Sequence, residues 1–480
     1  MDQTRNKSPK IGLIAKLSYG SGQAVDAVVQ AAVNTFLLFY LTAVCGLSGS
    51  VAGSIFLISL VVDALFDPAI GHLSDTTRSR WGRRLPYMAG ALLPMMIAAF
   101  FIFNLPQGAG PGLLYAAALI LNIVLRVGLS FFALPHSALL AEFTNDYSER
   151  AVIGSYRALF IFIGTAAILL PGFGYIFAKS GALETRDAYP AFGLLTAALI
   201  GVFGLSCLLG IFRRTLALPV PLAEGAQQRG GIIRDVVQLF KNRSFVLMFA
   251  GAVIVLVGQG ATMALNLHAF RYFWKLPPAF IQLPLLMLPV GMLVGTVVAA
   301  LLLKRVEKRD GVIGAVLMIG CYQILATLLA WSGVIAPGSF GAIALGAGSG
   351  FLFGAGGAMC FICFYAMIAD AVDEHELMFD IRREALFAAA LMIGSKAATG
   401  LGAFIAGLGL QIVGFVQPSN EAVSPSVAPQ IASDLGLLWG PVPALVILAS
   451  IPLFRVYKID RQRHVEILRV LARKAESAEI

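Results

Sequence analysis

The segment "VVDALFDPAIGHLSDTTRSRWGRRLPYM", residues 61–88, places two aspartates, Asp63 and Asp67, inside an apolar run and follows them with a basic loop. The aspartates are four residues apart, so a helix presents both on one face. A charge within a bilayer costs about 3 kcal/mol or more unless it meets water or a partner, which makes such residues functional candidates. The segment therefore predicts a membrane helix that carries a functional pair of carboxylates.

The composition of the whole chain indicates a membrane protein. Of its 480 residues, 58% are hydrophobic and 13% are charged, and the mean hydropathy is +0.84. Soluble domains carry about 25% charged residues, and a helix needs about 20 apolar residues to cross a bilayer. We therefore predict an all-α integral membrane protein with twelve transmembrane helices, over 19–45, 48–73, 86–105, 112–141, 152–178, 190–212, 244–273, 279–303, 312–333, 338–368, 384–414 and 433–454.

A long polar stretch in the middle of the chain separates six of these helices from the other six. The predicted parts are an N-terminal six-helix bundle (1–215), a cytoplasmic middle loop (216–243), a C-terminal six-helix bundle (244–456) and a cytoplasmic tail (457–480). Each half carries a basic loop after its second helix, at 75–84 and, more weakly, at 304–311. This pattern is typical of secondary transporters built from repeats, with the site near the midplane.

The basic residues set the expected orientation. Most of the 35 Lys and Arg residues fall in the N-terminus, alternate loops and the tail, which places both termini in the cytoplasm by the positive-inside rule. The net charge of +9 is thus a topology signal, and no nucleic-acid partner is expected. The polar N-terminus predicts no cleavable signal, so we expect a multi-pass protein of the plasma (cell inner) membrane. The tail is expected to be either an amphipathic helix that touches anionic lipid headgroups or a solvated segment.

Polar residues at helical spacing locate the expected site. The first helix carries Tyr19, Gln23, Asp26, Gln30 and Asn34 on one face. The fourth carries Asn122, Arg126 and Ser130 at four-residue spacing, the seventh carries Gln259, Thr262 and Asn266, and the eleventh carries Lys396. The alternative is that the intramembrane charges only pair with one another to hold the helices together.

Other function classes find little support in the sequence. A nucleotide-binding loop of the G-x-x-x-x-G-K-[ST] type is absent, which argues against a primary pump or ABC-type protein. The His and Cys residues are dispersed, so an enzyme is not expected, and a channel or membrane enzyme is the weaker alternative. Cys360 and Cys363, with two residues between them, lie inside an apolar, Gly-rich helix that is itself predicted to serve close helix packing. The two cysteines are predicted to be packing residues rather than metal ligands or a disulfide. No cofactor is expected beyond a coupling cation.

Several motifs carry a family resemblance. They are "KLSYGSG" and "YLTAVCGLS" around the first helix, the segment from Asp63 to Pro86, and "DAVDEHE" followed by "RREALF" from Asp370 to Phe387. With them the chain resembles the glycoside-pentoside-hexuronide cation symporters (melibiose permease-like) of the major facilitator superfamily. The resemblance implies that superfamily's fold of two six-helix halves and cation-coupled symport of a sugar or glycoside by alternating access.

The resemblance also implies residue roles. Asp63 and Asp67 would form the coupling-cation site, with Ser130 and Lys396 as helpers. Arg157 matches, with a one-residue gap, an arginine that contacts sugar. With the polar stripes, the expected substrate-binding set is Gln23, Asp26, Gln30, Asn34, Asn122, Arg126, Arg157 and Asn266. The basic loop would be a conformational latch made by Asp75, Arg78, Arg80, Gly82, Arg83 and Arg84.

Departures from the family pattern bear on the substrate. Ala27 and Ala133 stand where the family has sugar-binding aspartates, which makes a galactoside a poor candidate. Arg126 stands at a glycine position, and with Arg157 it could bind an anion through bidentate hydrogen bonds. An anionic, hexuronide-like sugar is therefore expected, with an amphipathic anion such as a lysophospholipid as the alternative. His136 is either a structural residue or a proton-responsive donor.

The coupling ion depends on the same comparison. Phe66 stands where the family has an asparagine of the cation site. A bare sodium ion needs several oxygen ligands, whereas a proton needs one carboxylate, and burial beside a second carboxylate and the Phe66 ring would favour its protonation. We therefore expect H⁺ coupling, with a possible Na⁺ at Asp63 and Asp67 if backbone carbonyls or water replace the amide. A small-molecule substrate, membrane lipids as neighbours and a monomeric state complete the expectations.

Overall fold

A computed structural model describes residues 12–144, 146–179, 181–216, 237–415 and 427–478. The described chain is helical, without strands, and eleven of its helices are long and apolar enough to cross a membrane. The first predicted span is helical as well, as α1 (Leu13–Ala31) followed by two π-helical turns, η1 (Ala32–Leu37) and η2 (Tyr40–Val44), although it is not among the eleven. The all-α membrane fold is confirmed.

The chain divides into two compact units. The first comprises Met1–Glu224 with Val416–Ser426, and the second comprises Gly225–Phe415 with Val427–Ile480. The division falls inside the expected middle loop, most of which lies outside the described residues, so the expected bounds of the halves stay a prediction.

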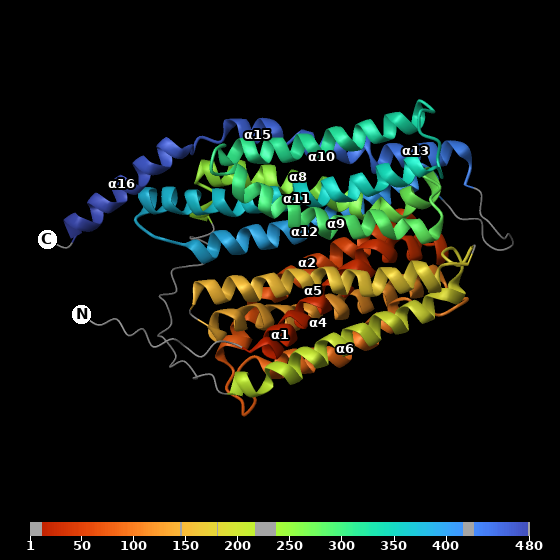
Figure 1. Ribbon diagram of the computed structural model, residues 1–480, viewed down its shortest axis with the longest axis horizontal. Coiled ribbons are helices and arrows are strands. Elements are labelled where there is room, and N and C mark those ends of the chain that lie inside the picture. The colour runs from red at the N-terminus through yellow and green to blue at the C-terminus, as the bar shows by residue number, and fades with distance from the viewer. Residues whose placement is uncertain (1–11, 145, 180, 217–236, 416–426, 479–480) are drawn as a thin grey trace. The chain divides into compact units, whose positions relative to one another are not determined.

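The first unit is a helical bundle in which α1 packs on α5 and α6, and α4 packs on α2 and α3 (Figure 1). After α1, η1 and η2, its elements are α2 (Gly49–Thr76), α3 (Leu85–Ile102), α4 (Pro111–Phe143), α5 (Tyr147–Pro171), η3 (Gly172–Ile176), η4 (Arg186–Ala188) and α6 (Tyr189–Leu216). Sequential helices run antiparallel, so the start of α1, the α2–α3 loop and the end of α4 meet at one end of the unit.

The second unit is also a bundle, in which α9 packs on α11 and α8 on α12. Its elements are α8 (Arg243–His268), η5 (Ala269–Phe273), α9 (Pro278–Leu302), α10 (Lys308–Trp331), α11 (Phe340–Phe379), α12 (Glu384–Ile412), α13 (Pro429–Trp439), α14 (Pro441–Leu448), α15 (Ile451–Val456) and α16 (Arg461–Ala478). The last predicted span is thus three short helices, because proline cannot continue a helical hydrogen-bond ladder.

The first span of each unit ends in the same backbone geometry. In Tyr40–Leu47 and in Ala269–Leu276, one N–H bonds to the carbonyl five residues earlier at 2.8 Å, and the N–H two residues on bonds to the carbonyl six residues earlier at 2.9 Å. The residue between them has positive φ: +71° at Gly46 and +51° at Lys275. Glycine adopts this conformation without steric cost, whereas lysine does not. The shared geometry indicates that the two units are repeats of one plan.

Glycines bring α9 and α11 into close contact. A Cβ at Gly291 of α9 would collide with the carbonyl oxygen of Phe351, and one at Gly350 of α11 would collide with that of Pro284. Small residues let backbones approach in this way where lipid supplies no hydrophobic driving force. The Gly-rich helix α11 therefore serves close packing against α9.

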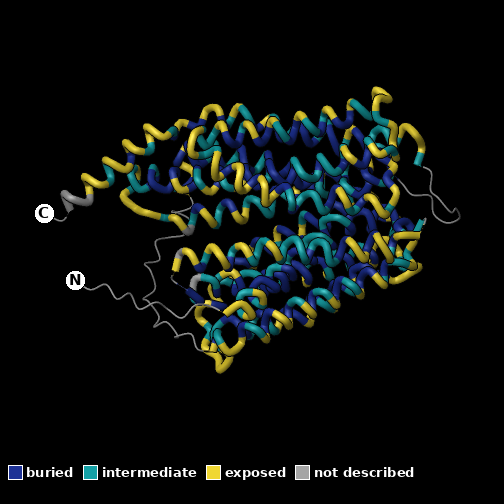
Figure 2. The backbone as a smooth tube through the Cα atoms, viewed as in Figure 1, coloured by how far each residue is buried: buried dark blue, intermediate teal, exposed yellow. Residues whose placement is uncertain are grey.

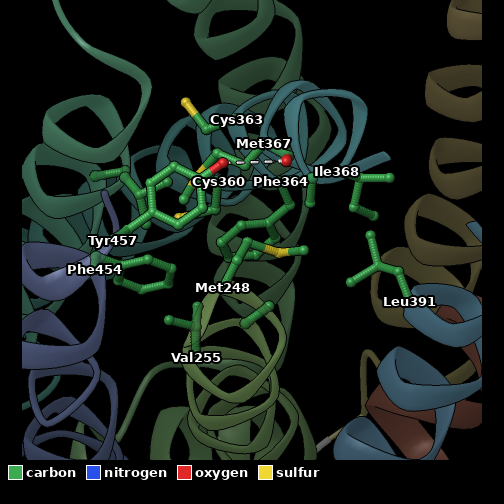
Figure 3. Close-up of a cluster of buried hydrophobic side chains, with 14 of the residues drawn as sticks. Met248, Val255, Cys360, Cys363, Phe364, Met367, Ile368, Leu391, Phe454 and Tyr457 are labelled. Carbon is green, nitrogen blue, oxygen red and sulfur yellow. Dashed lines mark hydrogen bonds between the residues drawn. The ribbon is translucent and has the colours of Figure 1, made fainter. Parts of the chain in front are cut away.

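A cluster of buried apolar side chains forms the core of the second unit at its α8, α11 and α15 helices (Figure 3). Cys360 and Cys363 are buried in this cluster as packing residues. The Tyr457 hydroxyl donates to the carbonyl oxygen of Met367 at 3.3 Å. The C-x-x-C spacing therefore belongs to the core, as predicted.

The tail forms α16, which extends from the second unit and is exposed along much of its length (Figure 2). It packs on α11 through Ile467, which is buried, and through His464, whose Nε2 lies 2.9 Å from Asp373 Oδ2. The tail is thus an ordered helix tied to the second unit. Its contact with lipid stays a prediction.

Candidate functional site

The carboxylate pair lies on α2 and is buried, with Asp63 and Asp67 each 4% exposed. Ser130 of α4 donates its hydroxyl to Asp63 Oδ1 at 2.6 Å. The structure therefore brings together three of the four residues expected to couple transport to a cation.

A second polar contact joins the same two helices. Asn122 of α4 donates to Ser59 Oγ of α2 at 2.7 Å, and both side chains are fully buried. The Asn122 carbonyl oxygen has no hydrogen-bond partner within the described part of the chain. Sequence reasoning missed Ser59, although its place four residues before Asp63 continues the spacing of the aspartates.

Arg126 lies between these contacts on α4 and is 5% exposed. It donates to Asn34 Oδ1 across 3.4 Å, which is long for a hydrogen bond, and its Nε has no partner among the residues that the structure covers. The carboxylates of Asp63 and Asp26 act on it electrostatically. A guanidinium offers five N–H donors, so Arg126 retains the capacity to bind an anion.

The polar stripe of the first span is connected by side-chain hydrogen bonds. Arg157 of α5 donates to Gln23 Oε1 from Nε at 3.0 Å and from Nη2 at 2.7 Å, and Gln23 donates in turn to Asp26 at 3.0 Å. Asn34, within the π turn η1, donates to Gln30 at 2.9 Å. All of these side chains are half-buried. The stripe thus links α5 to α1 and, through Arg126, to α4.

Phe66 does not belong to this buried group. Its side chain is 48% exposed, whereas Asp63 and Asp67 are buried. The expectation that its ring helps to bury the carboxylates is therefore wrong. Ser130 of α4 is a buried side chain that contacts Asp63.

The described contacts of His136 join two helices. The Tyr19 hydroxyl donates to the His136 carbonyl oxygen at 2.8 Å, and His136 Nε2 lies 2.8 Å from the Tyr19 carbonyl oxygen. The two rings stack at 4.3 Å, and both residues are buried. Because the Nε2 edge of the imidazole is used to join α1 to α4, the structural interpretation is favoured over a proton-responsive donor.

The expected latch is an ion-pair network around Glu142, at the end of α4. Arg84, at the start of α3, lies 2.7 Å from Glu142 Oε1 and 3.2 Å from Asp75 Oδ1, and Arg83 also pairs with Glu142. Burial lowers the pKa of Arg84, and the charge of Glu142 opposes that shift. Gly82 supplies the turn with φ of +82°.

The other two latch residues, Arg78 and Arg80, are exposed, and Arg80 lies over the ring of Trp81 at 5.6 Å. They form no ion pair with Glu142 in the part of the chain that the structure describes. Glu142 was missed by the sequence analysis. The available signal was that this acidic residue ends an apolar helix, on the side of the membrane where the loop with four arginines is expected.

The second unit has a matching contact. Lys308, at the start of α10, lies 2.6 Å from Asp370 Oδ1, near the end of α11. These are the third and fourth spans of their unit, as α3 and α4 are of the first.

The two remaining expected site residues lie in the second unit. Lys396 is half-buried on α12, and Asn266 of α8 accepts a hydrogen bond from Trp439 Nε1 at 2.8 Å. Beside Asn266 on the same stripe, Thr262 accepts from Gln323 of α10 at 3.2 Å, a partner that the sequence did not reveal. The roles of Lys396 in coupling and of Asn266 in binding stay predictions.

Comparison with known proteins places this arrangement in a family. Residues 18–461 match the family described as MFS/sugar transport protein. An isoprimeverose transporter of Lactiplantibacillus pentosus is 25% identical over 89% of this chain and 85% of its own length. A glucuronide carrier protein homolog of Escherichia coli is 24% identical over 94% of both chains. A sodium-dependent lysophosphatidylcholine symporter of Gallus gallus is 22% identical over 96% of this chain and 89% of its own.

Solved structures share the fold. The nucleoside transporter NupG superposes with a TM-score of 0.63 at 16% identity, covering 93% of this chain and 100% of that one. At this identity the similarity shows the fold alone, which is that of the major facilitator superfamily. The resemblance to glycoside-pentoside-hexuronide symporters is thus confirmed, and an enzyme is ruled out by the family.

Proposed function

This chain belongs to the MFS/sugar transport protein family, and we propose that it is a proton-coupled symporter of an anionic sugar or glycoside that works by alternating access. Relatives over most of its length are named for glucuronide and isoprimeverose, which supports a sugar substrate. A hexuronide-like molecule is the class that combines the family's sugars with the charge of the site.

The observation that carries the anionic substrate is Arg126. Its guanidinium is buried within a membrane span, where an incompletely bonded charge is costly. A carboxylate would accept two parallel N–H bonds from such a group. Arg157, held in place by Gln23, would act as the second cation of the site.

The proposed coupling site is Asp63 and Asp67 with Ser130. Two carboxylates on one helix face repel each other, so binding of a proton relieves local charge once per cycle. The Ser130 hydroxyl donates to Asp63, which places a polar partner from α4 beside the proposed site. Lys396 is the proposed fourth member, and no cofactor beyond the cation is invoked.

A sodium ion is the alternative, favoured by one backbone feature. Pro68 lies inside α2 and has no N–H, so the carbonyl of Ala64 loses its helical donor. That oxygen lies on the turn between Asp63 and Asp67 and could stand in for the missing amide ligand. The alternative substrate is a lysophospholipid, supported by the Gallus gallus relative.

We further propose that both termini lie in the cytoplasm of a cell inner membrane, that the protein acts as a monomer among lipids, and that the Glu142 network is the conformational latch. The positive-inside distribution of Lys and Arg supports the orientation.

Uptake by proteoliposomes tests the coupling ion. A pH gradient without sodium should drive accumulation of a glucuronide, whereas a sodium gradient at equal pH should not. Accumulation with sodium alone would replace the proton with sodium. Failure of both gradients would reject symport.

Arg126→Gln tests the substrate charge. Removing a charge-assisted, bidentate contact costs about 1.5–3 kcal/mol, so the KM for a glucuronide should rise roughly 10- to 100-fold. Arg126→Lys keeps the charge but loses the planar fork, and should fall between the wild type and Gln. An Arg126→Gln protein with an unchanged KM would remove the anionic substrate from the proposal.

A further inference from the structure

A cavity of about 520 Å³ lies at the end of the second unit where α8 begins, α11 ends and α16 starts. It is distinct from the polar group of the first unit and from the Lys308–Asp370 contact. Its walls include four basic side chains, Lys241, Arg243, Lys458 and Arg463, and one carboxylate, Glu374.

The charge on these walls is poorly compensated. Within the described part of the chain, Lys241, Arg243 and Lys458 form no ion pair, and Arg463 pairs with Glu466 at 2.7 Å. These four side chains are exposed, and a cleft lined mainly by one sign of charge raises the local positive potential, which attracts anions. The cavity therefore has the electrostatic character of an anion site.

A buried hydroxyl gives a second, independent sign of a ligand. Ser244 lines the cavity, is 7% exposed, and makes no hydrogen bond to any other described residue. It is the second residue of the 26-residue helix α8, whose N-terminus carries a partial positive charge. The N-cap Asn242 bonds to the N–H of Phe245 at 2.9 Å, so the earlier N–H groups of the helix stay available to an anion.

We propose that this cavity binds a phosphate group, and specifically the headgroup phosphate of an anionic membrane lipid. The cavity lies at the ends of two membrane spans, where headgroups are found, and Leu247 and Met378 add apolar wall beside the cations. Ser244, Arg243 and Lys458 would hold the phosphate oxygens. Glu374 would accept a hydrogen bond from a headgroup hydroxyl, which fits phosphatidylglycerol.

The site differs from the proposed transport site in location and ligand, so it does not depend on which sugar is carried. A soluble phosphate has the same chemistry as the lipid phosphate, and only the experiment separates the two sources. The basic residues at this end are also the ones that the proposed orientation places at the cytoplasmic leaflet, where anionic lipids attract Lys and Arg.

Thermal unfolding of the purified full-length protein tests the proposal. The protein is titrated with phosphatidylglycerol, with phosphatidylcholine, and separately with inorganic phosphate. Phosphatidylglycerol should raise the Tm of the wild type, because a ligand of the folded state stabilises it by mass action. The double variant Arg243→Gln, Lys458→Gln should bind it about tenfold or more weakly, since two charge-assisted contacts are lost.

Ser244→Ala is a milder variant that keeps every charge and should weaken phosphatidylglycerol binding several-fold. Arg213→Gln with Lys304→Gln, which removes two cations outside the cavity, is the matched control and should respond like the wild type. A response to inorganic phosphate that both cavity variants lose would support the site and assign a soluble ligand.

Two results would overturn the proposal. The first is a double variant and a Ser244→Ala protein that both keep the full wild-type response. The second is a wild type that phosphatidylglycerol stabilises no more than phosphatidylcholine and that ignores phosphate.

Discussion

The two units hold their second and fourth spans together by different means. In the first unit, α2 and α4 meet through hydrogen bonds, from Ser130 to Asp63 and from Asn122 to Ser59. In the second, α9 and α11 meet through glycines against carbonyl oxygens. The first contact includes a carboxylate, Asp63, whereas the second is made of glycines and backbone carbonyl groups. The proposed coupling contact and a contact that only packs helices together thus occupy equivalent places in the two units.

Away from the middle of the spans, the units agree. The end of α4 bonds the start of α3 through Glu142 and Arg84, and the end of α11 bonds the start of α10 through Asp370 and Lys308. The two units therefore differ most in the middle of their second and fourth spans, where the first unit carries Asp63 and Asp67.

The largest expected effect is at the titratable contact. Asp63→Asn should reduce accumulation against a gradient to the equilibrated level, because an amide cannot bind and release the coupling proton. Insertion and expression should be unchanged, since removing a buried charge does not oppose membrane insertion. Uptake ratios in proteoliposomes measure this.

Asp187→Asn, in the η4 turn, is the control for Asp63→Asn and should accumulate substrate normally. If the Asp63→Asn protein still concentrates substrate, Asp63 does not couple transport to a cation. The proposed functional difference between the α2–α4 contact and the α9–α11 contact would then be wrong.

A substitution in the glycine contact between α9 and α11 should lower the stability of the protein rather than its coupling. Gly291→Ala places a methyl group against the Phe351 carbonyl, and overpacking of this kind costs about 1–3 kcal/mol, so the Tm should fall by several degrees. Gly314→Ala on α10, where a Cβ meets nothing within 4 Å, is the matched control and should leave the Tm unchanged or raise it. Equal Tm values for the two variants would mean that α9 and α11 do not depend on close approach.

The ion pairs of Glu142 should affect the rate of transport rather than substrate binding. Glu142→Gln removes the shared partner of Arg83 and Arg84, and should change the transport rate several-fold with little change in substrate affinity, because a latch biases conformations and does not touch substrate. Arg83→Ala should act in the same direction with a smaller effect. Counterflow rates with direct binding measurements separate the two quantities. Weakened binding at an unchanged rate would move this loop into the substrate site.

The smallest effect is expected at the turns that end the first span of each unit, at Gly46 and at Lys275. Lys275→Gly should stabilise the protein by up to about 1 kcal/mol, because the left-handed conformation costs a lysine about 1–2 kcal/mol and glycine recovers only part of that through its own entropy. Gly46→Ala should destabilise it by a similar amount. Chemical or thermal unfolding compares them, and a Lys275→Gly protein that is less stable than the wild type would show that the two turns are not equivalent.

Apolar runs were enough to predict the helical membrane fold, because the cost of unsatisfied backbone in lipid leaves few options. The division of the last span was not predictable from hydropathy, although Pro441 gave a signal. Ser59 and Glu142 escaped because their roles depend on which residue of another helix lies opposite. Phe66 was misjudged for the same reason: a sequence position says which residue is replaced, and only packing says whether its ring is buried.

The π turns that end the first span of each unit should affect how fast backbone amides exchange with solvent. Such turns are rare and less stable than α-helix, so backbone hydrogen bonds there should break locally at lower free energy, and their amide protons should exchange sooner with solvent. In the first unit these turns lie at the opposite end from the Glu142 ion pairs. Hydrogen exchange in the first unit should therefore begin at the end that lies away from Glu142.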